Sequence, residues 1–139
     1  IQKEVKAGGV KFLLVHGSPR KNNEDILPDT PLSEVEKMLE NVDADVVLCG
    51  HTHIPCGFQT ESRKTVVNAG SIGRTFFVEP NSYPKACYLI IEVDNGSCVF
   101  QHQFVEYDKE QASEKLAARE FEGADKLAGM LINPEIRHF

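Results

Sequence analysis

The pattern of apolar and polar positions predicts strands alternating with a helix in the first third of the chain. Residues 10–15 are almost continuously apolar and include β-branched and aromatic side chains, which is typical of a strand buried on both faces. Residues 45–49 predict a second buried strand. Between them, Thr30 and Pro31 fit an N-cap and a first helical position, and the following apolar residues recur at helical spacing until near Asn41.

The middle of the chain predicts two β-hairpins. Residues 58–60 and 65–68 flank a polar turn, and residues 86–93 and 98–106 flank the sequence Asp-Asn-Gly-Ser. Asn-Gly between two apolar runs is a strong hairpin signal, because both residues tolerate a positive φ. We therefore expect antiparallel strands after the second buried strand.

Two short helices are expected after the second hairpin. Asp108, with Gln111 three residues later, indicates a helix N-terminus, and this helix is expected to end near Arg119. A second helix is expected over residues 124–131, where an Asn-Pro pair follows. The order of the elements predicts an α/β (α+β) layer structure that forms a single domain over residues 1–139.

Composition and charge exclude several classes of function. Apolar residues make up 41% and charged residues 26% of the chain, as in an ordinary globular protein. No apolar run approaches the roughly 18–20 residues that a membrane-spanning helix needs. The formal net charge of −6 argues against broad affinity for nucleic acid or anionic membranes. It would also repel an anionic substrate, unless bound cations reversed the sign locally.

The cysteines are expected to be reduced thiols. Cys49, Cys87 and Cys98 lie in apolar runs that resemble strands, and no two cysteines form a C-x-x-C pair. Because no signal-peptide pattern opens the sequence, we favour buried thiols in a cytoplasmic protein over disulfides. A zinc site of Cys and His side chains is an alternative, since Cys49 and Cys56 bracket two histidines, but the spacing fits no common zinc knuckle.

The stretch Gly50-His51-Thr52-His53 follows the second predicted strand and carries the strongest chemical signal. Ligands are usually presented where the strands of an α/β sheet end, and Gly50 permits a tight turn there. Two histidines at i and i+2 of an extended chain point to the same side, so we expect both imidazoles in one cavity. Imidazole is a good ligand for Zn, Mn, Fe, Ni and Co. This position favours a metal site, although H-x-H alone is weak evidence.

His16 stands in the same position after the first predicted strand. If the two strands are neighbours, His16, His51 and His53 meet at one rim of the sheet. Three imidazoles would suit a single zinc ion, whereas a site that processes phosphate would require carboxylates as well. His102, inside a predicted strand, is expected to serve packing or to be partly exposed.

Three segments, in this order, resemble successive motifs of the calcineurin-like metallophosphoesterases. They are V-H-G-S-P-R at residues 15–20, C-G-H-T-H-I-P at residues 49–55 and V-V-N-A-G-S-I-G at residues 66–73. The likeness extends from Val10 to about Tyr107 and is greatest to the small prokaryotic phosphodiesterase-like branch. It implies the downstream part of a four-layer αββα sandwich with mixed sheets, and a metal-dependent hydrolase of phosphate esters.

The resemblance implies a site with two divalent metal ions, drawn from Mn, Fe, Zn, Ni and Co. His16 and His51 would bind one ion and His53 the other. Two ions about 3.5–4 Å apart would lower the pKa of a bridging water and neutralise phosphate oxygens. Such ions would also allow an acidic protein to bind a phosphate-ester substrate.

The resemblance also places a substrate-binding region. Asn68 opens a loop that matches the family's N-P-G-S motif, with Ala69 in place of the proline, and the loop would lie close behind the metal ions. Arg20 and Arg74 flank the motif loops and could each hold a phosphate through two hydrogen bonds. Asn68, Arg20 and Arg74 are therefore the candidates for substrate binding.

Part of the family's pattern is absent from the sequence. The family also needs an Asp-x-His motif, a Gly-Asp motif and an Asn-His-Asp/Glu motif, all upstream of the strand that begins here at Val10, and none of the three occurs. The chain starts at Ile1 with a short polar flank over residues 2–9. We expect a portion of a longer domain, incomplete and inactive alone, with no catalytic residue to assign. Its exposed strand edges would favour association, so a homo-oligomer is expected.

Two other functions are left open. Some relatives of the resembled family keep the fold as a protein-binding scaffold after metal ligands are lost. A structural zinc module would instead use His51, His53 and Cys56.

Overall fold

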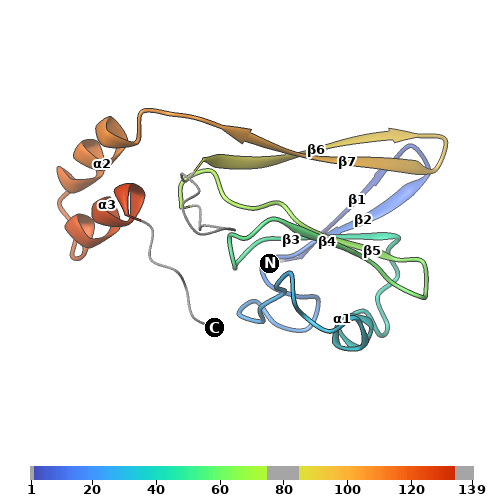
Figure 1. Ribbon diagram of the computed structural model, residues 1–139. Coiled ribbons are helices and arrows are strands. Elements are labelled where there is room, and N and C mark those ends of the chain that lie inside the picture. The colour runs from blue at the N-terminus through green and yellow to red at the C-terminus, as the bar shows by residue number, and fades with distance from the viewer. Residues whose placement is uncertain (1, 75–84, 134–139) are drawn as a thin grey trace.

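The computed structural model describes residues 2–74 and 85–133, and this part of the chain forms two sheets and three helices (Figure 1). The larger sheet has five strands in the order β1-β2-β3-β5-β4, and the smaller sheet pairs β6 with β7. The strands of the larger sheet are β1 (Lys3–Ala7), β2 (Val10–Leu14), β3 (Val46–Cys49), β4 (Cys56–Gln59) and β5 (Thr65–Asn68). This mixed architecture confirms the predicted α/β fold class.

Three parallel strands form the centre of the larger sheet. β2 pairs with β3, with Phe12 opposite Val46, and β3 pairs with β5, with Val47 opposite Val66. The two apolar runs predicted as buried strands are therefore adjacent and parallel. Their carboxyl ends lie at the same edge of the sheet, where ligands of α/β proteins are usually bound.

The outer strands of the larger sheet are antiparallel to their neighbours. β4 forms the predicted hairpin with β5, from Cys56 opposite Asn68 to Gln59 opposite Thr65. β1 pairs with the whole of β2 and occupies the segment that we expected to be a polar flank. All five residues of β1 are exposed, as suits a polar flank, but no signal in the sequence indicated that this flank forms a strand.

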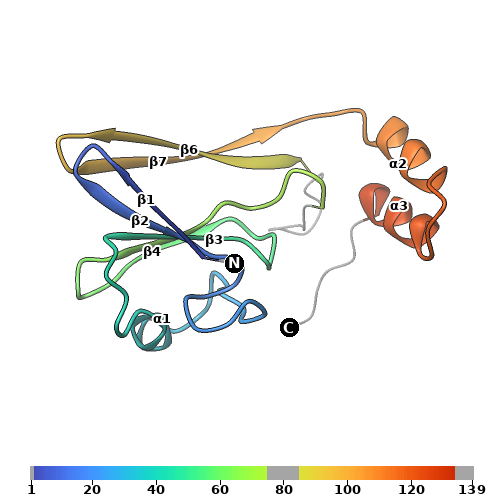
Figure 2. The same cartoon turned by 180° about the vertical axis from the view of Figure 1, so that it is seen from behind.

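Helix α1 (Leu32–Met38) covers one face of the larger sheet (Figures 1 and 2). Val35 and Met38 are buried, which confirms the predicted apolar stripe. The core between helix and sheet consists of Leu13, Ile26, Val35, Met38, Leu39, Ala44, Val47, Cys49 and Val66.

The start of α1 differs from the prediction. Pro31 is the N-cap, and no side chain caps the helix. The hydroxyl of Thr30 instead accepts a hydrogen bond from the backbone N–H of Leu27 at 2.8 Å, so it closes the preceding turn. At the other end, Asn41 has a φ of 68°, which turns the chain out of helical geometry near the predicted end.

β6 (Ala86–Asp94) and β7 (Ser97–Val105) form the second predicted hairpin and lie over the other face of the larger sheet (Figure 2). The turn residues Asn95 and Gly96 have φ values of 47° and 82°, as the Asn-Gly signal requires. The core between the two sheets is formed by Val10, Phe12 and Val46, with Leu14, Leu48, Ile91, Val93, Cys98 and Phe100 packed against it.

Helices α2 (Lys109–Ala117) and α3 (Ala124–Ile132) pack on each other at one end of the β6–β7 hairpin (Figure 1). Asp108 caps α2 as predicted, because its carboxylate accepts from the backbone N–H of Gln111 at 2.8 Å. Within the described ranges, no helix covers the outer face of β6–β7. None of the described helices is long and apolar enough to cross a bilayer.

Candidate metal centre

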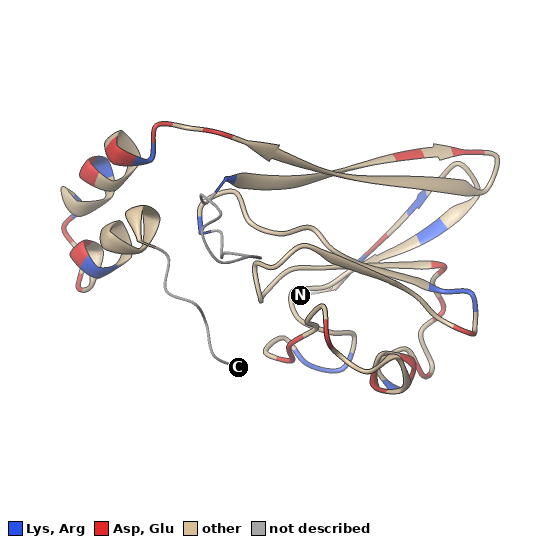
Figure 3. Cartoon of the chain, viewed as in Figure 1, with Lys and Arg blue, Asp and Glu red and all other residues tan. Residues whose placement is uncertain are grey.

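The three motif segments lie side by side where β2, β3 and β5 end. Backbone hydrogen bonds continue the sheet past the ends of the strands: Gly50 N–H donates to the carbonyl of His16 at 2.9 Å, and Ala69 N–H donates to the carbonyl of Cys49 at 3.0 Å. The sheet itself therefore fixes the distance between the first histidine motif and the second. Charged residues lie in the loop between β2 and α1, whereas β3 and β5 carry none (Figure 3).

His16 and His51 meet at this edge. Nδ1 of His51 lies 3.1 Å from Nε2 of His16, and the ring centroids are 5.0 Å apart with an interplanar angle of 66°. Two imidazole nitrogens on adjacent positions of one cation, each at about 2.0–2.1 Å from it, are separated by roughly 3.0–3.4 Å. The His16–His51 pair has this separation. In the structure the two rings share a hydrogen bond at this distance, and the same separation would suit two ligands of one divalent cation.

The backbone of the Gly-His-Thr-His turn is not the extended chain that we expected. φ is 64° at both His51 and His53, and Thr52 N–H donates to the carbonyl of Gly50 at 2.7 Å. The alternation of side chains along a strand, on which the shared-cavity prediction rested, does not apply to this left-handed turn. The expectation of an extended chain was wrong, and a shared cavity for both imidazoles stays a prediction.

His53 is half-buried. Among residues 2–74 and 85–133, no three His, Cys, Asp or Glu side chains are grouped so that they could hold a metal ion. The structure thus brings together two of the three predicted ligands, and a role for His53 at a second ion stays a prediction.

A clamp of hydrogen bonds holds the turn in its left-handed geometry. The side-chain amide of Asn68 donates to the carbonyl of Gly50 at 2.6 Å and to the hydroxyl of Thr52 at 3.0 Å. The same hydroxyl accepts from the N–H of Ile54 at 3.3 Å. A left-handed backbone costs about 1–2 kcal/mol for each non-glycine residue. These bonds offset that cost, because Asn68 and Thr52 are fully buried and exchange no bond with water.

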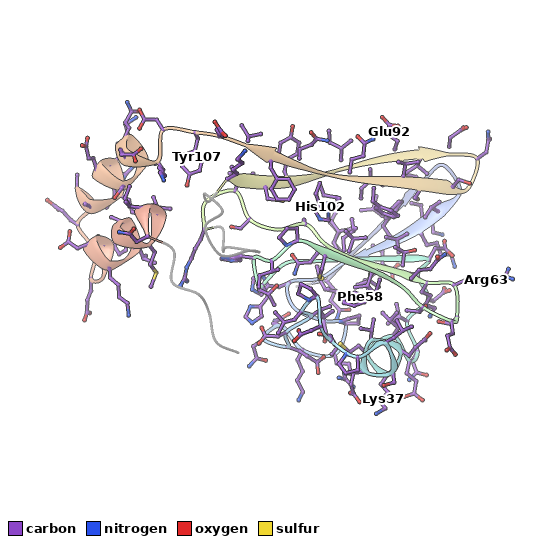
Figure 4. All side chains as sticks on the ribbon, viewed as in Figure 1. Lys37, Phe58, Arg63, Glu92, His102 and Tyr107 are labelled. Carbon is purple, nitrogen blue, oxygen red and sulfur yellow. The ribbon has the colours of Figure 1, made fainter. Side chains whose placement is uncertain are left out.

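Asn68 also joins the two sheets. Its side-chain oxygen accepts from the N–H of Gly70 at 3.0 Å, and its backbone carbonyl lies 2.7 Å from Nε2 of His102 on β7. His102 points from β7 toward the larger sheet (Figure 4). Contact between the Asn68 amide and a substrate, as predicted, would require these internal bonds to open. His102 was expected to serve packing, and its bond to a motif residue had no signal in the sequence.

A second network orders the loop after β2. The hydroxyl of Ser18, which is buried, donates to the carboxylate of Glu24 and accepts from the N–H groups of Arg20 at 3.0 Å and Lys21 at 3.1 Å. Nε and Nη2 of Arg20 donate to the same carboxylate at 3.1 and 2.6 Å. The Arg20 guanidinium is the main cause of the lowered pKa of Glu24, and Ser18 adds to it. A phosphate ester would have to compete with Glu24 for Arg20.

Two more residues bear on the site: Arg74, which was predicted to bind substrate, and Asp25. The N–H of Arg74 donates to the hydroxyl of Ser71 at 3.1 Å, and substrate contact by its guanidinium stays a prediction. Asp25, which the sequence did not single out, lies near the histidine pair, with Oδ1 3.4 Å from Nε2 of His51. No motif signal marks Asp25 or Glu24, because both lie in an irregular loop whose path depends on long-range contacts.

The four cysteine thiols are free, and Cys49 and Cys56 are protonated by burial. Burial raises the pKa of Cys49 to about 12 and that of Cys56 to about 11. The thiol of Cys56 faces the carbonyl of Ile26 at 3.9 Å. In the described part of the chain, Cys56 forms no metal-binding group of three side chains with His51 and His53, which weighs against the structural zinc module.

Two solved structures share the fold. Hypothetical protein PH1004 from Pyrococcus horikoshii OT3 has a TM-score of 0.78 at 24% identity, over 99% of this chain and 52% of its own. A metallophosphoesterase from Sphaerobacter thermophilus has a TM-score of 0.63 at 20% identity, over 92% of this chain and 57% of its own. The chain thus spans about half of the length of these structures.

Sequence comparison identifies the family. No curated protein sequence matches the chain. A family model described as the calcineurin-like phosphoesterase superfamily domain matches residues 2–96, which include the His16 and His51 motifs. The motif resemblance is thereby confirmed, and this chain belongs to the calcineurin-like phosphoesterase superfamily.

Proposed function

We propose that this chain supplies the histidine-bearing part of the site of a metal-dependent hydrolase of phosphate esters. The single observation that carries the proposal is the 3.1 Å separation of Nε2 of His16 and Nδ1 of His51 at the end of two parallel strands. His16 and His51 would hold a divalent cation, which would act as a Lewis acid and lower the pKa of bound water. Two ions from the set Mn, Fe, Zn, Ni and Co belong to the proposal, with His53 at the second.

The residues of this chain hold and orient the reacting groups. His16 and His51 provide neutral nitrogen ligands, and the buried Asn68 amide keeps the second of them in its left-handed turn. Arg20 and Arg74 bind phosphate oxygens, and Arg20 exchanges the carboxylate of Glu24 for the substrate. We assign Asn68 a positioning role, because its amide is committed to the fold.

The rest of the site is proposed to come from residues outside this sequence. The Asp-x-His, Gly-Asp and Asn-His-Asp/Glu motifs of the resembled family do not occur in these 139 residues. We therefore expect the chain alone to be inactive. A cytoplasmic location, inferred from the cysteine pattern, is part of the same proposal.

A protein-binding scaffold is the second candidate. The outer face of β6–β7 favours it, since large apolar side chains on that face are exposed: Tyr88, Ile90, Val99 and Val105. Exposed apolar patches on a folded domain mark sites of interaction with other proteins.

Calorimetric titration of the full chain with Zn²⁺ tests the leading proposal. We expect binding that His16→Ala and His51→Ala each abolish and that Asp29→Asn, which removes an exposed charge from the same loop, leaves nearly unchanged. Cys56→Ser should also leave binding unchanged, whereas a structural zinc module predicts its loss. A native chain that binds no metal, or binding that survives His16→Ala, would refute the proposal. With Mn²⁺, the chain alone should hydrolyse a p-nitrophenyl phosphodiester slowly or not at all.

A further inference from the structure

Asp25 approaches the free side of the His51 ring. Nδ1 of His51 faces His16 at 3.1 Å, and Nε2, on the opposite side of the ring, lies 3.4 Å from Oδ1 of Asp25. That oxygen is buried, and in the described part of the chain it has no partner at hydrogen-bonding geometry. One imidazole thus lies between a second imidazole and a carboxylate, and neither the family motifs nor the proposed function gives Asp25 a role.

The position of Asp25 relative to His51 is built into the fold. Ile26, the next residue, is buried in the core beneath α1, and its carbonyl lies 3.5 Å from the hydroxyl of Thr52, the residue after His51. The loop that carries Asp25 is therefore attached to the turn that carries His51. The attachment joins the two residues that directly follow Asp25 and His51 in the chain. The carboxylate faces the ring because the core holds this part of the loop.

The two neighbours of His51 select one tautomer. A neutral imidazole carries its proton on one nitrogen and a lone pair on the other. With the proton on Nε2, His51 donates toward Asp25, and its Nδ1 lone pair accepts the hydrogen bond from Nε2–H of His16. With the proton on Nδ1, the Nε2 lone pair would face a carboxylate, which is repulsive. Only the first arrangement leaves a lone pair on Nδ1 of His51, to which a cation would bind in place of the proton shared with Nε2 of His16.

We propose that Asp25 is a positioning residue that keeps the proton of His51 on Nε2, so that Nδ1 is presented as a metal ligand. Carboxylates that accept from the second nitrogen of a metal-bound histidine fix its tautomer and raise its basicity. The inference rests on the proposed metal site and goes beyond it, because it names the group that prepares the ligand before the cation arrives.

The experiment uses the full chain, with Zn²⁺ as the probe, and the variants Asp25→Ala, Asp25→Asn and Asp29→Asn. Asp29 is exposed in the same loop, so its loss controls for net charge. Loss of an outer carboxylate typically lowers metal affinity about 10- to 100-fold, and we expect Asp25→Ala to fall in this range and Asp29→Asn to change affinity by less than about threefold. Asp25→Asn should recover part of the loss, because its side-chain carbonyl can still accept from Nε2.

The ring nitrogens of His51 give a second measurement that requires no metal. In nitrogen-15 spectra of histidine-labelled chain, native His51 should show its proton on Nε2, and Asp25→Ala should raise the population with the proton on Nδ1. Equal affinities and equal ring spectra for the native chain and Asp25→Ala would overturn the inference. A native chain that binds no Zn²⁺ would refute the proposed function instead, and the ring spectra would still decide the role of Asp25.

Discussion

The side-chain amide of Asn68 lies 2.6 Å from the carbonyl oxygen of Gly50, so a buried side chain on β5 holds the turn that carries both motif histidines. The turn needs such support, because φ is 64° at His51 and at His53 and neither residue is glycine. The position of the His51 ring is therefore set by a residue that has no need to contact the metal or the substrate.

Asn68→Asp should weaken both the fold and the histidine pair. The change keeps the shape of the side chain but turns an oxygen, in place of the donor, toward the carbonyl of Gly50. Buried groups that lose their partner cost about 1–3 kcal/mol each, so we expect a loss of about 2–4 kcal/mol in the free energy of unfolding. Urea denaturation measures it. Asn23→Asp, at an exposed position, is the control, and equal stability of the two variants would contradict the role of the clamp.

Gly17→Ala should disorder the loop after β2. A Cβ at Gly17 would lie 2.5 Å from the carbonyl oxygen of Asn22 and 2.8 Å from that of Lys21, and backbone atoms cannot move aside as a side chain can. We expect lower thermal stability and weaker Zn²⁺ binding, since His16 is adjacent. Gly129→Ala is the matched control, because nothing lies within 4 Å of its added Cβ and alanine favours a helix by about 0.5–1 kcal/mol. The two variants should shift the melting temperature in opposite directions.

Local signals were sufficient to predict most of the fold. The two continuous apolar runs are the parallel strands β2 and β3, and Asn95-Gly96 forms the turn of the second hairpin. Each of these signals lies within a few residues of sequence, so the element can be predicted without knowing which strand it pairs with. β1 has no such signal, because all of its side chains are exposed and only its backbone bonds to β2 define it as a strand.

Only those site residues that directly follow a buried strand could be predicted from the sequence. His16 and His51 each follow a buried strand, and adjacent parallel strands bring the two rings together. The left-handed turn at His51 depends on Asn68, which lies on another strand, and the approach of Asp25 depends on the path of a loop. Both are long-range effects that no local pattern in the sequence encodes.

Acid should loosen the loop between Ser18 and Glu24. Hydrogen bonds from Arg20 and Ser18 lower the pKa of Glu24, so the folded state favours the charged carboxylate. The stability from these bonds is present above the ordinary glutamate pKa of 4.5 and is lost as the pH falls through the lower pKa of the folded state. Amide exchange at Arg20 and Lys21, whose N–H groups donate to Ser18, should lose protection as the pH falls through the lowered pKa of Glu24.

Glu24→Gln supplies the comparison for this acid transition. The amide cannot ionise, so protection at the same two N–H groups should be lower at neutral pH and should show no transition in acid. A transition of equal size in Glu24→Gln would assign the effect to another carboxylate.

Alkali should destabilise the chain through Cys49. Burial raises the pKa of this thiol from 9.0 to about 12, and the nearby Cys56 adds to the shift. The folded state keeps a proton that the unfolded state loses, so the stabilisation is complete below the pKa of the unfolded thiol and is lost as the pH rises toward that of the folded one. The slope from one such thiol approaches 1.4 kcal/mol per pH unit, as a general upper value. Cys49→Ala should flatten the dependence of the unfolding free energy on pH above 9, and curves parallel to the native one would contradict this assignment.

The outer face of β6–β7 should make the chain associate, whereas the sequence predicted association through exposed strand edges. Val99, 54% exposed, lies on this face directly opposite Glu92, which points away from the larger sheet (Figure 4). A lysine at position 99 would remove apolar surface and face an opposite charge across the strands, a pairing worth about 0.2–1 kcal/mol. Val99→Lys should therefore reduce the mass measured by light scattering without a loss of thermal stability.

Val93→Lys separates association from folding. Val93 is the neighbour of Glu92 on the same strand, but its side chain points inward and packs against the core between the two sheets. A lysine there would bury a charge without a partner, so it should unfold the hairpin and increase aggregation. If Val99→Lys and Val93→Lys both raise the scattered mass, the outer face is part of the folded structure of the monomer and not a contact surface. If only Val93→Lys does so, self-association depends on the apolar outer face of β6–β7.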